Sequence, residues 1–131
     1  MDNIRIRPAV REDIPLILGF IRELAEYEKL SDQVVADEKT LESWIFDKQK
    51  AEVLFALADG KEAGFALFFH NFSTFLGRAG IYLEDLFVKP EYRGLGLGKA
   101  LLRALAQTAL ERGCGRLEWS CLDCISWWMY S

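Results

Sequence analysis

A run of closely spaced glycines separates a strand-like apolar segment from a helical one, and it constrains the fold more than any other feature. The run reads Arg93-Gly94-Leu95-Gly96-Leu97-Gly98. Glycine lets the backbone turn with positive φ and lets a ligand approach the main chain. Because the first N–H groups of a helix lack internal acceptors and lie at the positive end of its dipole, the run predicts an anion-binding loop. A glycine-rich turn without a ligand is the simpler alternative.

Apolar periodicity predicts one α+β domain over residues 1–131, with a mixed sheet and flanking helices. Strands are expected around residues 4–8, 53–58, 63–69, 81–88 and 116–122, with residues 71–80 as a loop. Helices are expected after Asp13, after an N-cap at Asp37, and between the glycine run and a stop at Gly113. The order is β-α-α-β-β-β-α-β, and the last three elements form a right-handed βαβ unit.

Composition limits the partners that this chain can bind. The net charge of −4 argues against sequence-independent nucleic-acid binding and favours small cationic substrates. No apolar run is long enough to span a bilayer and no basic leader is present, so we expect a cytoplasmic protein without a membrane partner. Cys121 and Cys124 have CxxC spacing, but a zinc site needs further ligands and His70 is the one histidine. We therefore expect reduced thiols and no metal.

Spacing separates three phosphate-binding interpretations of the glycine run. The chain has no GxxxxGK[ST] motif, and the glycines do not fit a dinucleotide fingerprint. The run does fit R-x-x-G-x-G. Residues 82–98, which read YLEDLFVKPEYRGLGLG, and residues 24–30, which read LAEYEKL, resemble the polyamine and thialysine branch of the GNAT superfamily of N-acetyltransferases. The resemblance extends from about Ile4 to Asp123 and implies a mostly antiparallel GNAT-like sheet.

The resemblance implies that acetyl-CoA is the cosubstrate, and it assigns residues to it. The pyrophosphate would be bound by the loop that comprises Arg93, Gly94, Leu95, Gly96, Leu97, Gly98 and Lys99. The backbone of Leu86, Phe87 and Val88 would pair with the pantetheine arm. A backbone N–H near Phe87 would stabilise the oxyanion during direct attack by a neutral amine.

The resemblance also implies an amine site on the fourth strand. A protonated amine must lose a proton before it attacks, and Glu84 is the favoured proton acceptor, acting through water. Asp85 is the second candidate; simple strand alternation places it on the opposite face from Glu84. An ion pair of Glu84 with Lys99 or Arg103 is the alternative.

Two residues at the end of the first expected helix complete the acceptor site that the resemblance implies. Tyr27 and Glu28 would contact the distal amine of the acceptor through charge and cation–π attraction, or they form a solvated helix end. His70 is expected to be an ordinary sheet residue, and Trp44 and Phe46 are expected in the core.

The resemblance fails after residue 123, where the last helix and closing strands of the family have no counterpart. The family tyrosine that protonates the CoA thiolate is not matched, and Tyr130 is not assigned that role. Three explanations stay open: a truncated acetyltransferase, a sheet completed by a second copy, or a CoA-binding homologue without turnover. The apolar residues 127–130 favour a homodimer. The expected function is acetylation of a polyamine or thialysine-like amine; a non-catalytic CoA-binding module and a protein N-acetyltransferase are the alternatives.

Overall fold

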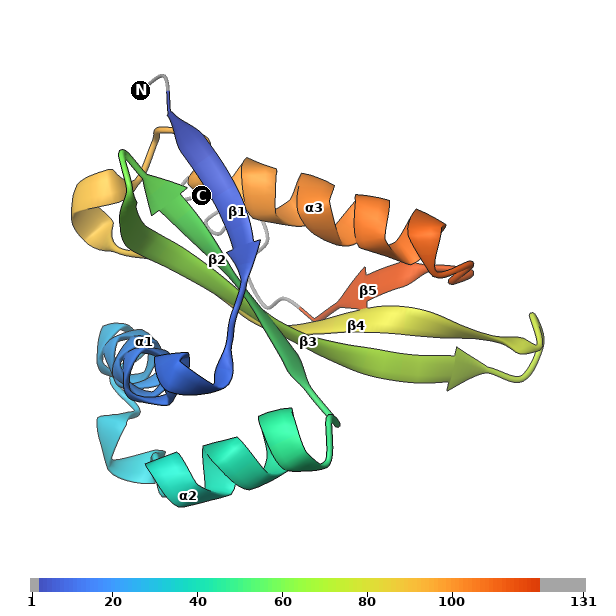
Figure 1. The fold of residues 1–131 in the computed structure, drawn as a ribbon, viewed down its shortest axis with the longest axis horizontal. Coiled ribbons are helices and arrows are strands. Elements are labelled where there is room, and N and C mark those ends of the chain that lie inside the picture. Colours follow the sequence, from blue (N-terminus) through green and yellow to red (C-terminus); the bar gives the residue numbers. More distant parts are fainter. Residues whose placement is uncertain (1–2, 121–131) are drawn as a thin grey trace.

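The computed structural model describes residues 3–120, which form one twisted five-stranded sheet with helices on both sides (Figure 1). The strand order is β1-β2-β3-β4-β5. The strands are β1 Ile4–Pro8, β2 Glu52–Ala58, β3 Lys61–Ser73, β4 Arg78–Val88 and β5 Leu117–Trp119. Neighbours from β1 to β4 are antiparallel, and β5 joins β4 in parallel. The predicted mixed, mostly antiparallel sheet is therefore confirmed.

The helices divide between the two faces of the sheet. Helix α1 (Ile14–Tyr27), α2 (Glu38–Leu41) and the π-helical turn η3 (Glu42–Asp47) cover one face, and α3 (Leu97–Glu111) covers the other (Figure 1). Short 3₁₀ turns lie at η1 Arg11–Asp13, η2 Ser31–Gln33 and η4 Pro90–Tyr92. Each face has its own apolar core. Phe20, Phe55, Phe65 and Phe87 fill the α1 side, and Leu97, Leu101 and Leu105 fill the α3 side.

The local signals for helix ends are confirmed. The Asp37 carboxylate accepts a hydrogen bond of 2.8 Å from the Thr40 amide, so Asp37 caps α2 as predicted. Gly113 has a φ of 71° directly beyond α3, which is the left-handed conformation that ends a helix.

Two predictions from local pattern are wrong, and a third is tested in part. The strand expected over residues 116–122 is present as β5, and residues 121 and 122 lie outside the described part of the chain. Most of the expected loop over residues 71–80 is β-structure, because β3 and β4 continue their pairing as far as Ser73 and Arg78. Trp44 is not core: its side chain is 52% exposed, with the Lys48 ammonium 3.9 Å from its ring centre.

Some predictions fall on residues that the structure does not describe. These are the CxxC cysteines, Tyr130 and the apolar segment 127–130. Within the described residues, no helix is long and apolar enough to cross a membrane.

Strand β4 contains a bulge that changes which side chains face which helix. Its register with β3 passes from Leu83 opposite Phe68 to Asp85 opposite Leu67, so Glu84 is an extra residue. Leu83 therefore faces α3, and so does Leu86, three positions later. Beyond the bulge Phe87 faces α1.

Gly64 allows β3 and β4 to approach closely just beyond this bulge. A Cβ at Gly64 would lie 3.1 Å from the Phe87 carbonyl oxygen and 3.3 Å from a Val88 methyl. We expect Gly64→Ala to lower the free energy of unfolding by about 1–2 kcal/mol, because a central backbone pair must shift. Urea denaturation measures this effect. Gly19→Ala, in α1 with no atom within 4 Å of the added Cβ, is the control and should raise stability by about 0.5–1 kcal/mol. Equal effects of the two variants would contradict the expectation.

Candidate active site

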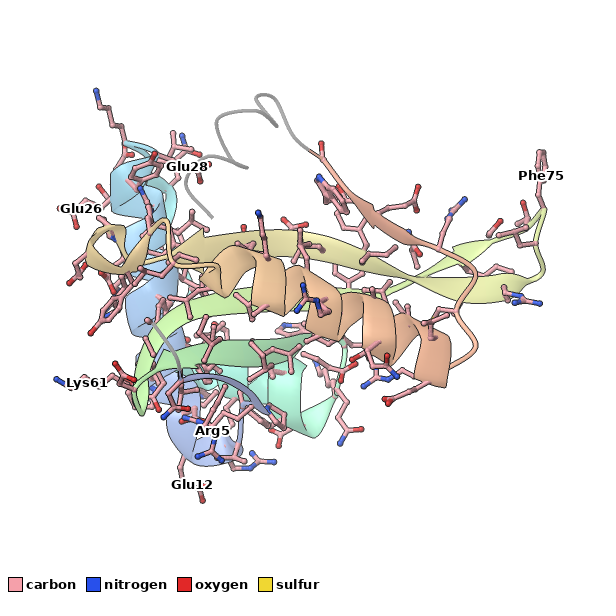
Figure 2. All side chains as sticks on the ribbon, turned by 90° about the horizontal axis from the view of Figure 1, so that it is seen from above. Arg5, Glu12, Glu26, Glu28, Lys61 and Phe75 are labelled. Carbon is pink, nitrogen blue, oxygen red and sulfur yellow. The ribbon has the colours of Figure 1, made fainter. Side chains whose placement is uncertain are left out.

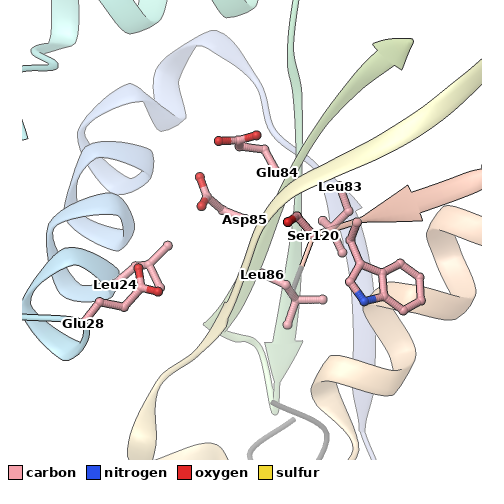
Figure 3. Close-up of a pocket in the computed structure, with 8 residues that line it drawn as sticks. Leu24, Glu28, Leu83, Glu84, Asp85, Leu86 and Ser120 are labelled. Atoms are coloured by element: carbon pink, nitrogen blue, oxygen red, sulfur yellow. The ribbon is translucent and has the colours of Figure 1, made fainter. Parts of the chain in front are cut away.

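The β4 bulge brings two carboxylates to the same side of the sheet. Glu84 follows the α3-facing Leu83, and Asp85 precedes the α3-facing Leu86, so both acidic side chains point towards α1 (Figure 3). The expectation that Glu84 and Asp85 lie on opposite faces is therefore wrong. Simple alternation fails because the inserted residue reverses the parity of the strand. Since α3 covers the other face, this orientation also disfavours an ion pair of Glu84 with Lys99 or Arg103.

A pocket of about 130 Å³ lies where β4, β5 and the end of α1 meet (Figure 3). Three acidic residues line it, namely Glu28, Glu84 and Asp85. Leu24, Leu83, Leu86, Trp119 and Ser120 complete the lining. The site therefore offers negative charge beside an apolar wall, an arrangement suited to an organic cation.

Asp85 is the carboxylate whose environment differs most from water. Partial burial raises its pKa to about 6, and the negative charges of Glu84 and Glu28 add to the increase. An amine cation placed beside Asp85 would stabilise the charged form and oppose this shift. The pocket therefore binds a cation most favourably when Asp85 is deprotonated.

Among residues 3–120, no strand pairs with the β5-side edge of β4 beyond Leu83, and we call this stretch, which lies beside the pocket, the open edge. Strand β5 pairs with β4 only at residues 81–83, within the described residues. The Lys89 amide bonds the Ala63 carbonyl of β3 at 2.8 Å, so by alternation the main-chain groups of Phe87 also point to β3. Those of Leu86 and Val88 point to the open edge.

Phe87 therefore differs from its predicted role. Its carbonyl lies against Gly64 in the β3–β4 ladder, and its ring is buried against α1. The structure does not support a Phe87 N–H directed at a ligand. The bulge again accounts for the difference, because it determines which residues present their main chain to the edge.

The glycine run forms a loop that ends in the first turn of α3. Gly94 and Gly96 have φ values of 80° and 92°, which residues other than glycine rarely adopt. The first intrahelical hydrogen bond is donated by the Ala100 amide to the Gly96 carbonyl at 3.0 Å. The N–H groups of Leu97 and Gly98 come before it and lie at the positive end of the helix. The backbone thus has the donor set that an anion requires.

Arg93 and Tyr27 contact each other rather than the pocket. The Arg93 guanidinium carbon lies 4.3 Å from the centre of the Tyr27 ring. Arg93 Nε also donates a hydrogen bond of 2.9 Å to the Val88 carbonyl. Tyr27 is 49% exposed and is not among the residues that line the pocket. Of the two predicted distal-amine residues, only Glu28 lies at the site.

His70 lies away from the site. It is exposed on β3, and its Nε2 atom is 3.3 Å from Arg112 at the end of α3. Trp119 and Ser120 are pocket residues that sequence reasoning missed. Nothing in their spacing connects them to residues 83–86, because only the parallel pairing of β5 with β4 brings them there.

A loop with amides for an anion, an open strand edge and an acidic pocket are the parts that acyl transfer from a phosphate-containing donor to an amine requires. Residues 19–126 match the Acetyltransferase (GNAT) family. The chain therefore belongs to the GNAT family and is an acyl-CoA-dependent N-acetyltransferase.

Curated relatives place it more narrowly within the family. The chain is 43% identical over 132 residues to thialysine N-epsilon-acetyltransferase of Bos taurus, covering 94% of this chain and 77% of the relative. It is 31% identical to an L-ornithine N5-acetyltransferase of Arabidopsis thaliana, covering 91% and 72%. It is also 31% identical to a spermidine/spermine N(1)-acetyltransferase-like protein of Homo sapiens, covering 87% of this chain and 17% of that protein.

Solved structures show the same fold. An aminoglycoside acetyltransferase from a soil metagenome, in complex with sisomicin, superposes with a TM-score of 0.81 at 20% identity and covers 95% of this chain and 82% of its own. A ribosomal-protein-alanine N-acetyltransferase from Brucella melitensis superposes with a TM-score of 0.76 at 25% identity, covering 91% and 80%. The GNAT fold expected from the sequence is confirmed.

Asp85 should reduce stability at neutral pH. Because its pKa is higher in the folded chain than the ordinary value of 3.8, this residue lowers the free energy of unfolding above pH 6, and the penalty disappears as pH falls towards 4. We expect Asp85→Asn to raise the free energy of unfolding at pH 7.5 by about 1–3 kcal/mol and to change it little at pH 4. Urea denaturation at both pH values tests this. Glu26→Gln, an exposed carboxylate on α1, should change it by less than about 0.5 kcal/mol; a pH-independent effect of Asp85→Asn would contradict the assignment.

Proposed function

We propose that this enzyme transfers an acetyl group from acetyl-CoA to a primary amine of a small molecule that carries a further positive charge, either a polyamine or a thialysine-like amino acid. The observation that carries the proposal is the acidic pocket beside the open edge of β4. Glu28 comes from α1 and the other two carboxylates from β4. Carboxylates on two elements can therefore bind two separate cationic groups of one molecule.

The chemistry of the pocket favours an ammonium over a metal ion. No group of three or more His, Cys, Asp or Glu side chains is arranged to hold a metal within residues 3–120. The apolar wall formed by Leu24, Leu86 and Trp119 suits a methylene chain between two amines. The named substrates of the similar proteins, thialysine, ornithine and spermidine or spermine, share this chemistry.

The residues present fit acetyl-CoA. We propose that the backbone N–H groups from Gly94 to Lys99 bind the pyrophosphate, and that the main chain of Leu86 and the N–H of Val88 pair with the pantetheine arm along the open edge. When bound, acetyl-CoA supplies the acetyl group as a reactive thioester. The positive φ of Gly94 and Gly96 supports this assignment, and so does the space beside them, because a Cβ added at either glycine would have no atom within 4 Å.

The two β4 carboxylates have different proposed tasks. Glu84 is exposed and is suited to take the proton of the amine through water, so that the neutral amine can attack. Asp85 is partly buried and, when charged, holds the ammonium next to it. Glu28 binds the distal positive charge. Negative charge at all three positions disfavours acidic acceptors.

We also propose that the enzyme is cytoplasmic and forms a homodimer. The odd number of cysteines, three, supports a reducing compartment. The apolar sequence Trp127-Trp128-Met129-Tyr130 supports association of two copies. Light scattering after size exclusion measures the mass; a monomer at micromolar concentration would contradict the dimer.

Substitution of the carboxylates should separate their tasks. We expect Glu84→Gln to lower kcat by about 10²-fold or more with the KM of the amine nearly unchanged, because the proton acceptor is removed. In the wild-type enzyme the KM of the amine should increase below pH 6, where Asp85 becomes protonated. We expect Asp85→Asn to have a higher KM for the amine and to lack this increase. Steady-state release of CoA with spermidine, ornithine and thialysine measures both. Glu26→Gln is the control and should behave as wild type. Release of no CoA by the wild-type protein with any of these amines would contradict the proposed function.

A charge in the loop should abolish binding of acetyl-CoA. We expect Gly96→Glu to weaken calorimetric binding by more than about tenfold, because the side chain repels the pyrophosphate and strains a backbone with positive φ. Gly77→Glu is the control. Gly77 also has a positive φ of 67° and open space around it, but it lies in the β3–β4 turn, next to Phe75 at the far end of the molecule from Glu28 (Figure 2). Unchanged binding in Gly96→Glu would contradict the assigned loop.

A further inference from the structure

Two cations on the segment that joins β4 to the glycine loop contact the same helix. Lys89 Nζ lies 3.3 Å from Glu23 Oε2 and 5.2 Å from the centre of the Phe20 ring. Four residues later, Arg93 lies over the Tyr27 ring. Both contacts are with α1, so the segment that leads into the anion-binding loop is attached to α1 along two of its turns.

The residues that Lys89 and Arg93 contact share one face of α1. The pocket residues of this segment are their immediate neighbours in the sequence. Phe20, Glu23 and Tyr27 are spaced by three and four positions, which places them on one side of a helix. Leu24 and Glu28, each one position further along, line the pocket. Any movement of the last turn of α1 therefore changes the position of the Glu28 carboxylate relative to Asp85 on β4.

The Arg93 side chain is held by three partners around its planar group. Its Nε donates to the Val88 carbonyl at 2.9 Å, and its guanidinium carbon is 4.3 Å from the Tyr27 ring centre and 5.3 Å from that of Phe87. The two rings meet edge to face with their centres 6.1 Å apart. A guanidinium combines a directional donor with a flat face that stacks on aromatic rings, whereas an ammonium has no such face.

We propose that Arg93 is a positioning residue for the amine pocket, which holds the last turn of α1 against β4 through Tyr27 and Phe87, rather than a residue whose guanidinium binds the pyrophosphate. The inference rests on the proposed function. It assigns Tyr27 the same task, so that Tyr27 acts on the amine through the placement of Glu28. The loop residue closest to β4 thus connects the donor site to the acceptor site.

Kinetics of three variants test the proposal. Arg93→Lys keeps the charge but removes the planar group. Tyr27→Leu removes the ring, and Tyr27→Phe is the matched control that keeps it. We expect Arg93→Lys and Tyr27→Leu each to raise the KM of the amine about five- to tenfold, with the calorimetric Kd of acetyl-CoA changed less than about twofold. Tyr27→Phe should remain within about twofold of wild type. The double variant Arg93→Lys/Tyr27→Leu should resemble the single variants, since both remove one contact.

Other outcomes would overturn the proposal. If Arg93→Lys weakens acetyl-CoA binding and leaves the KM of the amine unchanged, Arg93 is a ligand of the cofactor. If the fold-increases in the KM of the amine from the two substitutions multiply in the double variant, Arg93 does not act through Tyr27. If circular dichroism shows that Arg93→Lys does not fold, the comparison of Tyr27→Leu with Tyr27→Phe tests the proposal without it. Equal KM values for the amine in these two variants would reject the proposal. Turnover by the wild-type enzyme, measured first, separates failure of this inference from failure of the proposed function.

Discussion

The extra residue in β4 is the constraint on which the rest of the site depends. It reverses the alternation of the strand, so Leu83 before it and Leu86 after it both face α3. The opposite consequence is that two acidic residues next to each other in sequence share the α1 side. Partial burial raises the pKa of Asp85, and the negative charges of Glu84 and Glu28 raise it further. The bulge in β4 thus places the two carboxylates of the pocket side by side.

The same bulge determines which backbone groups are available beyond it. Phe87 turns its main chain towards β3, while Leu86 and Val88 turn theirs to the edge that β5 leaves open after residue 83. The chain continues from this edge to the positive end of α3, where Gly94 and Gly96 have positive φ and open space beside them. The acidic pocket, the open edge and the glycine run therefore follow one another along the chain from β4 to α3. Trp119 and Ser120 close one side of it.

Sequence reasoning succeeded where the signal was local. The turn at the glycine run, the cap at Asp37 and the stop at Gly113 depend on the conformational preferences of single residues, and the structure has the turn, the cap and the stop at these positions. It failed where long-range pairing decided the outcome. Ser, Thr and Gly between residues 71 and 80 suggest a loop, but pairing with each other extends β3 and β4 through most of that segment. Trp44 is apolar by type and still exposed, because the packing of η3 points it outward.

By itself, the sequence determined the family, the order of the elements and the identity of the acidic and glycine-rich segments, because these depend on residue types and their spacing along the chain. Only the tertiary structure decided that Glu84 and Asp85 point to the same side of the sheet, and that Leu86 and not Phe87 presents its backbone to the open edge. It also placed the Arg93 guanidinium over the Tyr27 ring. The physical reason is the same in each case: the direction of a side chain or an amide follows from strand register and from packing between distant segments, and neither can be read from a local pattern.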